Sequence, residues 1–243
     1  MKAVRVAGFA PSTSGFHFAN AFPSAPVIEF GRGSLRLPVG NAADGLCGGM
    51  IFAARDLFEA GHAPPADTEP PAPRSPLFRH LVRRLFDSFD LPSGPIRYLT
   101  WTALPESDTR WGLRGLAWRS VRNEWPKVKR DLDRGVLAPL GVVRLRSLKP
   151  WKVGQNHQLL AYGYDLDERP GRVFLQVYDP NHPDADDLTL KFDLEPTSHW
   201  KAEYVEGELP VRGFFRTRYR PRPVPGDLTA TATPRRGTRR SRP

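Results

Sequence analysis

The sequence predicts an α+β fold in which N-terminal helices pack on a C-terminal antiparallel β-sheet. Between residues 47 and 90, apolar residues recur every third or fourth position, the spacing of one helix face. From residue 136 onward the period changes to two, and turn residues separate short segments rich in β-branched and aromatic side chains. Helices followed by strands along a chain are typical of an α+β layer.

The first helix is expected over residues 47–60, after an irregular or short-stranded lead-in at 1–40. Asp44 and Gly45 are predicted to supply a capping side chain and a tight turn, and Gly61 would end the helix in a left-handed cap. The apolar face comprises Met50, Ile51, Ala54, Leu57 and Phe58. The opposite face comprises Arg55, Asp56 and Glu59.

A proline-rich surface loop is predicted next, because residues 62–76 hold six prolines. Ser75 and Pro76 are typical of an N-cap and a first helical residue, so a second helix should extend to about residue 90. We expect the polar side of that helix to be solvated; it comprises Arg79, His80, Arg83 and Arg84.

The remaining elements follow from the same patterns. Residues 91–124 are predicted to form buried irregular segments, and a further helix is expected to begin near Pro126 and end at Gly135. The apolar anchors of the irregular part are Trp101, Trp111, Leu113, Leu116 and Trp118. The predicted strands are 141–147, 156–165, 172–179, 187–194, 201–205 and 211–219.

Composition limits the classes of protein to consider. A single cysteine excludes an internal disulfide framework and favours a reducing compartment. No run of 18 apolar residues and no N-terminal leader pattern is found in the 243 residues, so we expect a cytoplasmic protein without a membrane span.

The positive charge is concentrated at the C-terminus. Residues 216–243 hold nine arginines and one acid, a net charge of +8, which leaves only +2 of the overall +10 for the other residues. We therefore predict one domain over residues 1–219 and a disordered basic tail over 220–243. The arginines at 235–242 could hold nucleic acid through its phosphates or could simply keep the terminus soluble, and the sequence favours neither.

Cys47 is a candidate nucleophile because it falls in the first turn of the first predicted helix. Free backbone N–H groups and the positive end of the helix dipole favour a thiolate there. Gly48 and Gly49 are expected to leave room for a substrate backbone to approach the sulfur. The alternative is that Cys47 is a small buried apolar residue.

A histidine and a carboxylate are expected near one end of a β-hairpin. If the turn at 166–171 pairs residue 165 with 172, His157 lies opposite Pro180, flanked by Asp179 and Asn181. An imidazole there could take the thiol proton, and Asp179 could orient the ring. Alternatively, each residue belongs to an ordinary strand end or turn.

Asn41 lies six residues before Cys47. Its side-chain amide could join the Cys47 backbone N–H in stabilising a tetrahedral oxyanion. A turn role for Asn41 is equally open.

Three motifs in this order resemble the papain-like cysteine peptidase superfamily: G-L-C-G-G-M at a helix start, N-H-Q-L-L-A-Y-G-Y-D, and V-Y-D-P-N-H-P. The segment at 130–143 resembles the branch related to bacteriocin leader peptidases, and the likeness covers roughly residues 40–195. The resemblance implies a papain-like fold and hydrolysis of a peptide or amide substrate without a cofactor. It implies that Cys47 is the nucleophile, His157 the general base and Asp179 the orienting acid, with Asn41 where papain-like enzymes commonly have glutamine.

Two other kinds of function remain open. A metal site could use His157, Asp179, His182 and Asp184, although no metal-binding spacing accompanies them. A papain-like binding module without turnover would keep the same shape and lack thiol reactivity.

Overall fold

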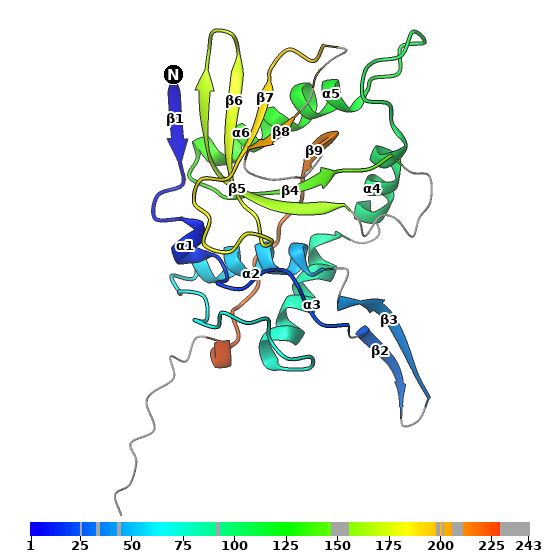
Figure 1. Ribbon diagram of the computed structural model, residues 1–243, viewed down its shortest axis with the longest axis vertical. Helices are drawn as coiled ribbons and strands as arrows, with labels where there is room; N and C mark the ends of the chain where they lie inside the picture. Colours follow the sequence, from blue (N-terminus) through cyan, green and yellow to red (C-terminus); the bar gives the residue numbers. More distant parts are fainter. Residues whose placement is uncertain are drawn as a thin grey trace, which may run out of the picture.

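A curled antiparallel β-sheet packed with helices forms the body of the protein (Figure 1). The structure is a computed structural model that describes residues 1–24, 26–32, 35–42, 45–90, 93–146, 156–197, 200, 202–205 and 211–228. In Figure 1 the sheet occupies the upper half and the helices α2 (Cys47–Glu59) and α3 (Pro76–Ser88) lie below it. The α+β class and the antiparallel sheet are therefore confirmed.

The sheet has the strand order β8-β7-β6-β5-β4-β9, and β1 pairs with the far end of β5. All of the pairings are antiparallel. The strands are β1 (Lys2–Arg5), β4 (Ala138–Val143), β5 (His157–Asp167), β6 (Arg172–Tyr178), β7 (Thr189–Asp193), β8 (Glu203–Val205) and β9 (Gly213–Arg216). A separate hairpin is formed by β2 (Pro26–Arg32) and β3 (Leu35–Asn41).

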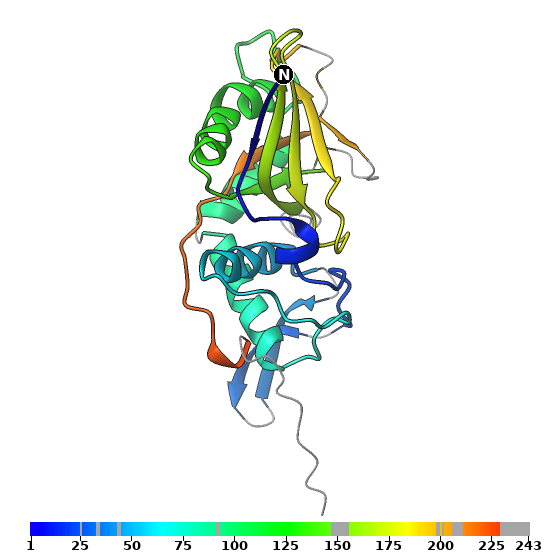
Figure 2. The same cartoon turned by 90° about the vertical axis from the view of Figure 1, so that its left-hand side faces the viewer.

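Along the chain, the helical elements lie between and after the strands. Besides α2 and α3, the structure contains α1 (Pro11–Ser14), α4 (Ser93–Ala103), α5 (Leu116–Trp118), a π-helical turn (Arg119–Glu124), α6 (Trp125–Asp133) and a short 3₁₀ helix (Gly226–Leu228). Helix α6 packs near β1, β5 and β9, and Figure 2 shows it against one face of the curled sheet.

Three of the predicted helices are confirmed within one or two residues. The Ser75 hydroxyl accepts the Phe78 N–H at 3.2 Å, so the predicted N-cap of α3 is present. In α6, Val128 and Leu132 are buried, and Gly135 has a φ of +70° just beyond the helix end. These helices can be predicted from the sequence because capping residues and apolar spacing agree.

The prediction for residues 91–124 was wrong in two respects. The segment contains α4, α5 and the π-helical turn rather than irregular structure alone. Trp111 and Leu113, which we expected to be buried anchors, are 97% and 45% exposed. A large apolar side chain in a loop does not by itself indicate burial.

Glycines allow α2 to approach its neighbours closely. A Cβ on Gly49 would lie 2.1 Å from the Leu81 carbonyl oxygen of α3, and one on Gly48 would lie 2.2 Å from the Ser88 hydroxyl. The expectation that these glycines make room for substrate was therefore wrong: both are buried against α3 and the start of β5.

The polar face of α2 is covered by the C-terminal segment. Asp56 is buried and bonds to Arg84 at 2.7 Å, to the Tyr219 hydroxyl at 2.5 Å and to the Arg222 backbone N–H at 3.1 Å. The Tyr219 ring also lies 3.7 Å from the Arg55 guanidinium. Arg84 is completely buried, so its predicted solvation was wrong.

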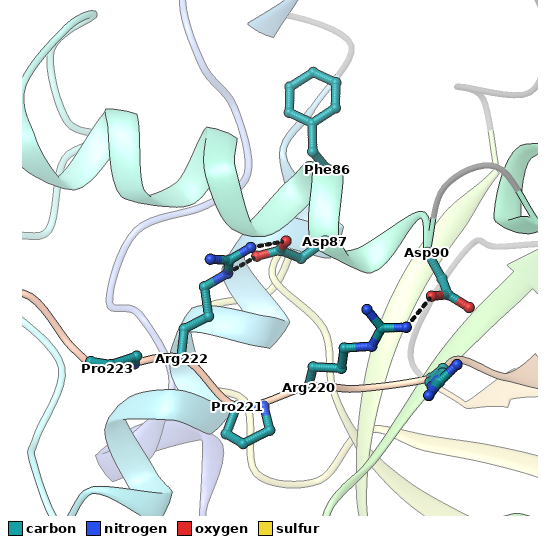
Figure 3. Close-up of a pocket in the computed structure, with 8 residues that line it drawn as sticks. Phe86, Asp87, Asp90, Arg220, Pro221, Arg222 and Pro223 are labelled. Carbon is teal, nitrogen blue, oxygen red and sulfur yellow. Dashed lines mark hydrogen bonds and ion pairs between the residues drawn. The ribbon is translucent and has the colours of Figure 1, made fainter.

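Residues 220–228 also differ from expectation. We predicted disorder from residue 220, but Arg222 makes a two-bond contact with Asp87 at 2.5 and 2.6 Å, and Arg220 lies 3.7 Å from Asp90 (Figure 3). A cavity of about 480 Å³ lies between this segment and the end of α3. Asp87 in the last turn of α3 and Asp90 just beyond the helix explain why an arginine-rich segment packs here. The basic run at 235–242 lies outside the described residues.

His80 was also predicted to be solvated. It is only 7% exposed, so this prediction was wrong. Residues 62–75 connect α2 to α3 without a helix or strand, as predicted for the proline-rich loop. Within the described part of the chain, no helix is long and apolar enough to cross a membrane.

We predict that Gly49→Ala lowers the free energy of unfolding by at least about 2 kcal/mol, because the added methyl group meets backbone atoms that cannot turn aside. Chemical denaturation would measure this. Gly226→Ala is the matched control, since no atom lies within 4 Å of its Cβ position; it should change stability by less than about 0.5 kcal/mol. Equal stability of the two variants would contradict the close α2–α3 packing.

Candidate functional site

Cys47 is the first residue of α2, as predicted, and is partly exposed. Leu46, at the N-cap position, provides no side-chain cap, and Gly45 precedes it with a φ of +92°, a conformation that favours glycine. The predicted cap Asp44 lies outside the described residues. The sulfur therefore lies in the first turn of a helix, where backbone N–H groups favour negative charge.

Asn20 fixes the turn before Cys47. Its side-chain oxygen accepts the Leu46 N–H at 2.6 Å, and its amide nitrogen donates to the Asn181 side-chain oxygen at 3.1 Å. Its backbone N–H also donates to the Pro180 carbonyl at 2.8 Å. One asparagine thus joins the start of α2 to the loop that follows β6.

His157 and Asp179 form a buried contact beneath this loop. His157 begins β5 and Asp179 follows β6; His157 Nε2 lies 2.7 Å from Asp179 Oδ1. Their exposed fractions are only 3% and 0%. Cys47 lies close enough to His157 to influence its pKa, and because Asp179 occupies Nε2, Nδ1 is the ring nitrogen that remains for the sulfur.

The predicted hairpin register differs slightly from the observed one. Asp167 rather than residue 165 pairs with Arg172, an offset of two residues, and the irregularity between Ala161 and Gly163 reduces the offset to one at the pair Leu160–Tyr178. If this pairing continues toward His157, Asp179 lies opposite Leu159, so Asp179 and His157 point to the same face of the sheet. His157 and Asp179 consequently still meet at one end of the hairpin.

The electrostatics of this cluster favour a charged imidazole. Burial alone would lower the pKa of His157, but the negative charge of Cys47, its hydrogen bond and the contact with Asp179 outweigh burial and raise that pKa to about 10. A histidine with such partners remains protonated at neutral pH.

Asp179 is held ionised by several donors. Burial opposes its charge, but bonds from His157, the Asn181 N–H at 2.8 Å and the Tyr204 hydroxyl at 2.8 Å bring its pKa below the usual 3.8. Tyr204 lies on β8, and burial together with Asp179 raises the pKa of its hydroxyl. Tyr204 therefore acts as a neutral donor to the carboxylate.

Tyr98 of α4 supports the other side of the histidine. Its hydroxyl donates to the His157 carbonyl oxygen at 3.4 Å, and it is nearly completely buried. Burial and the charge of Cys47 raise the pKa of Tyr98 well above its usual value. A Cβ on Gly141 of β4 would lie 2.6 Å from this hydroxyl, so glycine is needed there.

The structure thus brings together Cys47, His157 and Asp179, with Asn181 beside them through Asn20. Asn41 ends β3, but its side chain lies outside the described residues, so its role stays a prediction. Asn20, Tyr98 and Tyr204 were not found from the sequence. They lie in a lead-in loop, a helix and a short strand without any motif, and their contacts depend on the folded chain.

The described residues contain no group of three or more histidine, cysteine or carboxylate side chains suited to holding a metal ion. His17 Nδ1 binds Asp184 at 2.6 Å, and Asp179 is already occupied by His157 and Tyr204. These contacts give the metal hypothesis no support.

Comparison of the chain with protein-family models, curated proteins and solved structures finds no match in any of the three.

We predict that Tyr204→Phe destabilises the protein by about 1–3 kcal/mol at neutral pH, because the buried Asp179 carboxylate loses a donor. The loss should shrink on acidification. The lowered pKa of Asp179 gives stability above about pH 3.8, which disappears as pH falls through that pKa. In Tyr204→Phe the pKa of Asp179 is higher than in the wild-type protein. The variant therefore loses part of this stability, and it loses it only at pH values at which the Asp179 carboxyl is ionised.

Chemical denaturation at neutral and acidic pH would measure the difference. Tyr162→Phe is the control, since the Tyr162 hydroxyl donates at 2.6 Å to a backbone carbonyl, that of Asp186, which does not titrate. Its stability loss should be independent of pH. A pH-independent loss in Tyr204→Phe as well would contradict the proposed support of the Asp179 charge.

Proposed function

We propose that the protein is a papain-like cysteine hydrolase that cleaves a peptide or amide bond. The observation that carries this proposal is the meeting of a partly exposed cysteine at a helix start with a buried histidine that also contacts a buried aspartate. This is the arrangement that an activated thiol nucleophile requires.

The proposed reaction begins with the Cys47 thiolate and the His157 imidazolium. The sulfur attacks the scissile carbonyl carbon, and the tetrahedral intermediate collapses as His157 Nδ1 donates a proton to the departing amine. The resulting thioester is then attacked by a water molecule whose proton passes to His157. Collapse of the second intermediate releases the carboxylic acid and restores the thiolate–imidazolium pair.

Two groups would stabilise the oxyanion in each step. The backbone N–H of Cys47 belongs to the first turn of α2 and so has no partner within the helix. Asn41 is proposed as the second donor because its place in the sequence corresponds to the glutamine of papain-like enzymes. Asp179 would act as a positioning residue, since it contacts His157 and not the reacting atoms.

A papain-like binding module without turnover is the alternative. The small exposed fraction of His157 favours it, because an imidazole that is almost completely buried offers little surface to a substrate. Such a module would have a cysteine no more reactive than a free thiol. Association of nucleic acid with residues 220–243 is compatible with either function. It is proposed only on the basis of the positive charge of this segment.

We predict that iodoacetamide alkylates Cys47 rapidly at about pH 6, where less than about 1% of a free cysteine is ionised. His157→Ala and His157→Gln should each slow alkylation by at least about tenfold, because the imidazolium that stabilises the thiolate is lost. Mass spectrometry of the intact chain, with its single cysteine, would follow the reaction.

His62→Ala is the matched control, since His62 is exposed in the loop after α2 and should leave the rate unchanged. Thermal unfolding of each variant would show that it is folded at the assay temperature. Alkylation no faster than that of a free thiol, or the same rate in folded His157→Gln, would contradict the hydrolase proposal. Cleavage of a peptide library by the wild-type protein, lost in Cys47→Ser, would establish turnover.

A further inference from the structure

The loop between α4 and α5 (residues 104–115, the Trp111 loop) projects from the body at the upper right of Figure 1. Its two arms are joined at the base, where the Leu116 N–H donates to the Pro105 carbonyl at 2.9 Å and the Ala117 N–H to the Glu106 carbonyl at 3.0 Å. The Arg212 side chain bonds to Glu106 at 2.9 Å, which anchors the base beside β9.

Further contacts make the loop rigid up to its tip. Asp108 accepts the Gly115 N–H at 2.8 Å and pairs with Arg114, and the backbone groups of Thr109 and Leu113 bond across the loop at 3.0 Å. A Cβ on Gly115 would lie 2.5 Å from the Ser107 carbonyl, so only glycine allows the arms to approach this closely. The loop is therefore preorganised without a partner.

This rigid loop presents apolar side chains to solvent. Trp111 lies in the tip turn, which Gly112 closes with a φ of +82°, and is 97% exposed. Leu113, on the other side of Gly112, is 45% exposed. An exposed tryptophan on a preorganised turn is an interaction feature rather than part of the fold.

The charge around the loop is positive. The loop itself holds two arginines and two carboxylates, and residues 116–122 that follow it add two further arginines, so residues 104–122 carry a net charge of +2. Both carboxylates are already paired, Asp108 with Arg114 and Glu106 with Arg212. Arg110, Arg119 and Arg122 make no ion pair within the described residues, so they remain available to an anionic partner.

We propose that the Trp111 loop binds an anionic lipid surface, with Trp111 inserted at the level of the headgroups. Tryptophan favours the interface between water and lipid, and arginines near it attract anionic headgroups. A narrow tip suits a membrane, which needs only shallow insertion. A stable protein interface buries about 800 Å² on each partner and requires a broader surface.

The proposal is independent of the chemistry at Cys47, because no residue of the Trp111 loop contributes to the contacts of the site. Cys47→Ser should therefore bind lipid as the wild-type protein does. Absence of thiol reactivity would contradict the proposed hydrolase function, whereas absence of lipid binding would contradict only the proposed role of the Trp111 loop.

The test is co-sedimentation of the full chain with vesicles of phosphatidylcholine containing phosphatidylserine, and with vesicles of phosphatidylcholine alone. Wild-type protein should bind the anionic vesicles preferentially, and Trp111→Ala should weaken binding by about tenfold or more, the effect of losing one large buried apolar group. Ile96→Ala is the matched control, since Ile96 is 60% exposed on α4 outside the loop, and its binding should be unchanged. Brominated lipids should quench wild-type fluorescence more than that of Trp111→Phe.

Deletion of residues 229–243 distinguishes the contribution of the loop to lipid binding from that of the basic terminus. Vesicle binding by the shortened chain should still depend on Trp111. Equal binding of wild type and Trp111→Ala, binding lost entirely with the terminus, or no preference for anionic vesicles would overturn the proposal. Trp111-dependent retention of single-stranded oligonucleotides without vesicle binding would also overturn it and assign the loop to nucleic acid.

Discussion

The buried contact between His157 and Asp179 is the interaction on which the site depends. An ionised carboxylate with no exposed surface is tolerated in a protein only when donors surround it, and here they come from β5, from the Asn181 backbone and from Tyr204 of β8. The contact leaves one imidazole nitrogen for Cys47 and fixes the direction in which it points. The chemistry proposed for the cysteine follows from that orientation.

The nucleophile side of the site is held by different forces. Close packing through Gly49 sets the distance between α2 and α3, and Asn20 ties the turn before Cys47 to the loop after Asp179. At the other end of α2, Asp56 and Arg84 form a buried pair that the C-terminal segment completes through Tyr219. Figure 2 shows this segment running from β9 down to the helices, so the end of the chain holds α2 in place.

Much of this arrangement can be predicted from the sequence, because local signals and tertiary packing agree there. The cap at Ser75, the apolar spacing of α2 and the period of β5 and β6 each specify an element. The hairpin prediction placed His157 near Asp179 despite its register error, because an error of one residue at that end leaves both residues at the same end of the hairpin.

The remaining features depend on residues far apart in the chain. Arg84 follows the spacing of a solvated helix face, yet a segment 136 residues later covers it. Asn20 lies in an irregular lead-in, and its partner Asn181 is 161 residues away. Trp111 is a residue type that is usually buried, and its exposure follows only from the hydrogen bonds that shape its loop.

Cys47 and Asp179 together favour the charged form of His157. Nitrogen chemical shifts of the His157 imidazole, followed by NMR across a pH titration, test it most directly. We expect an imidazolium that persists well above neutral pH, with a pKa of about 10, and a marked fall of that pKa in Cys47→Ser. A neutral His157 ring at pH 7 in the wild-type protein, or a titration that Cys47→Ser leaves unchanged, would contradict it.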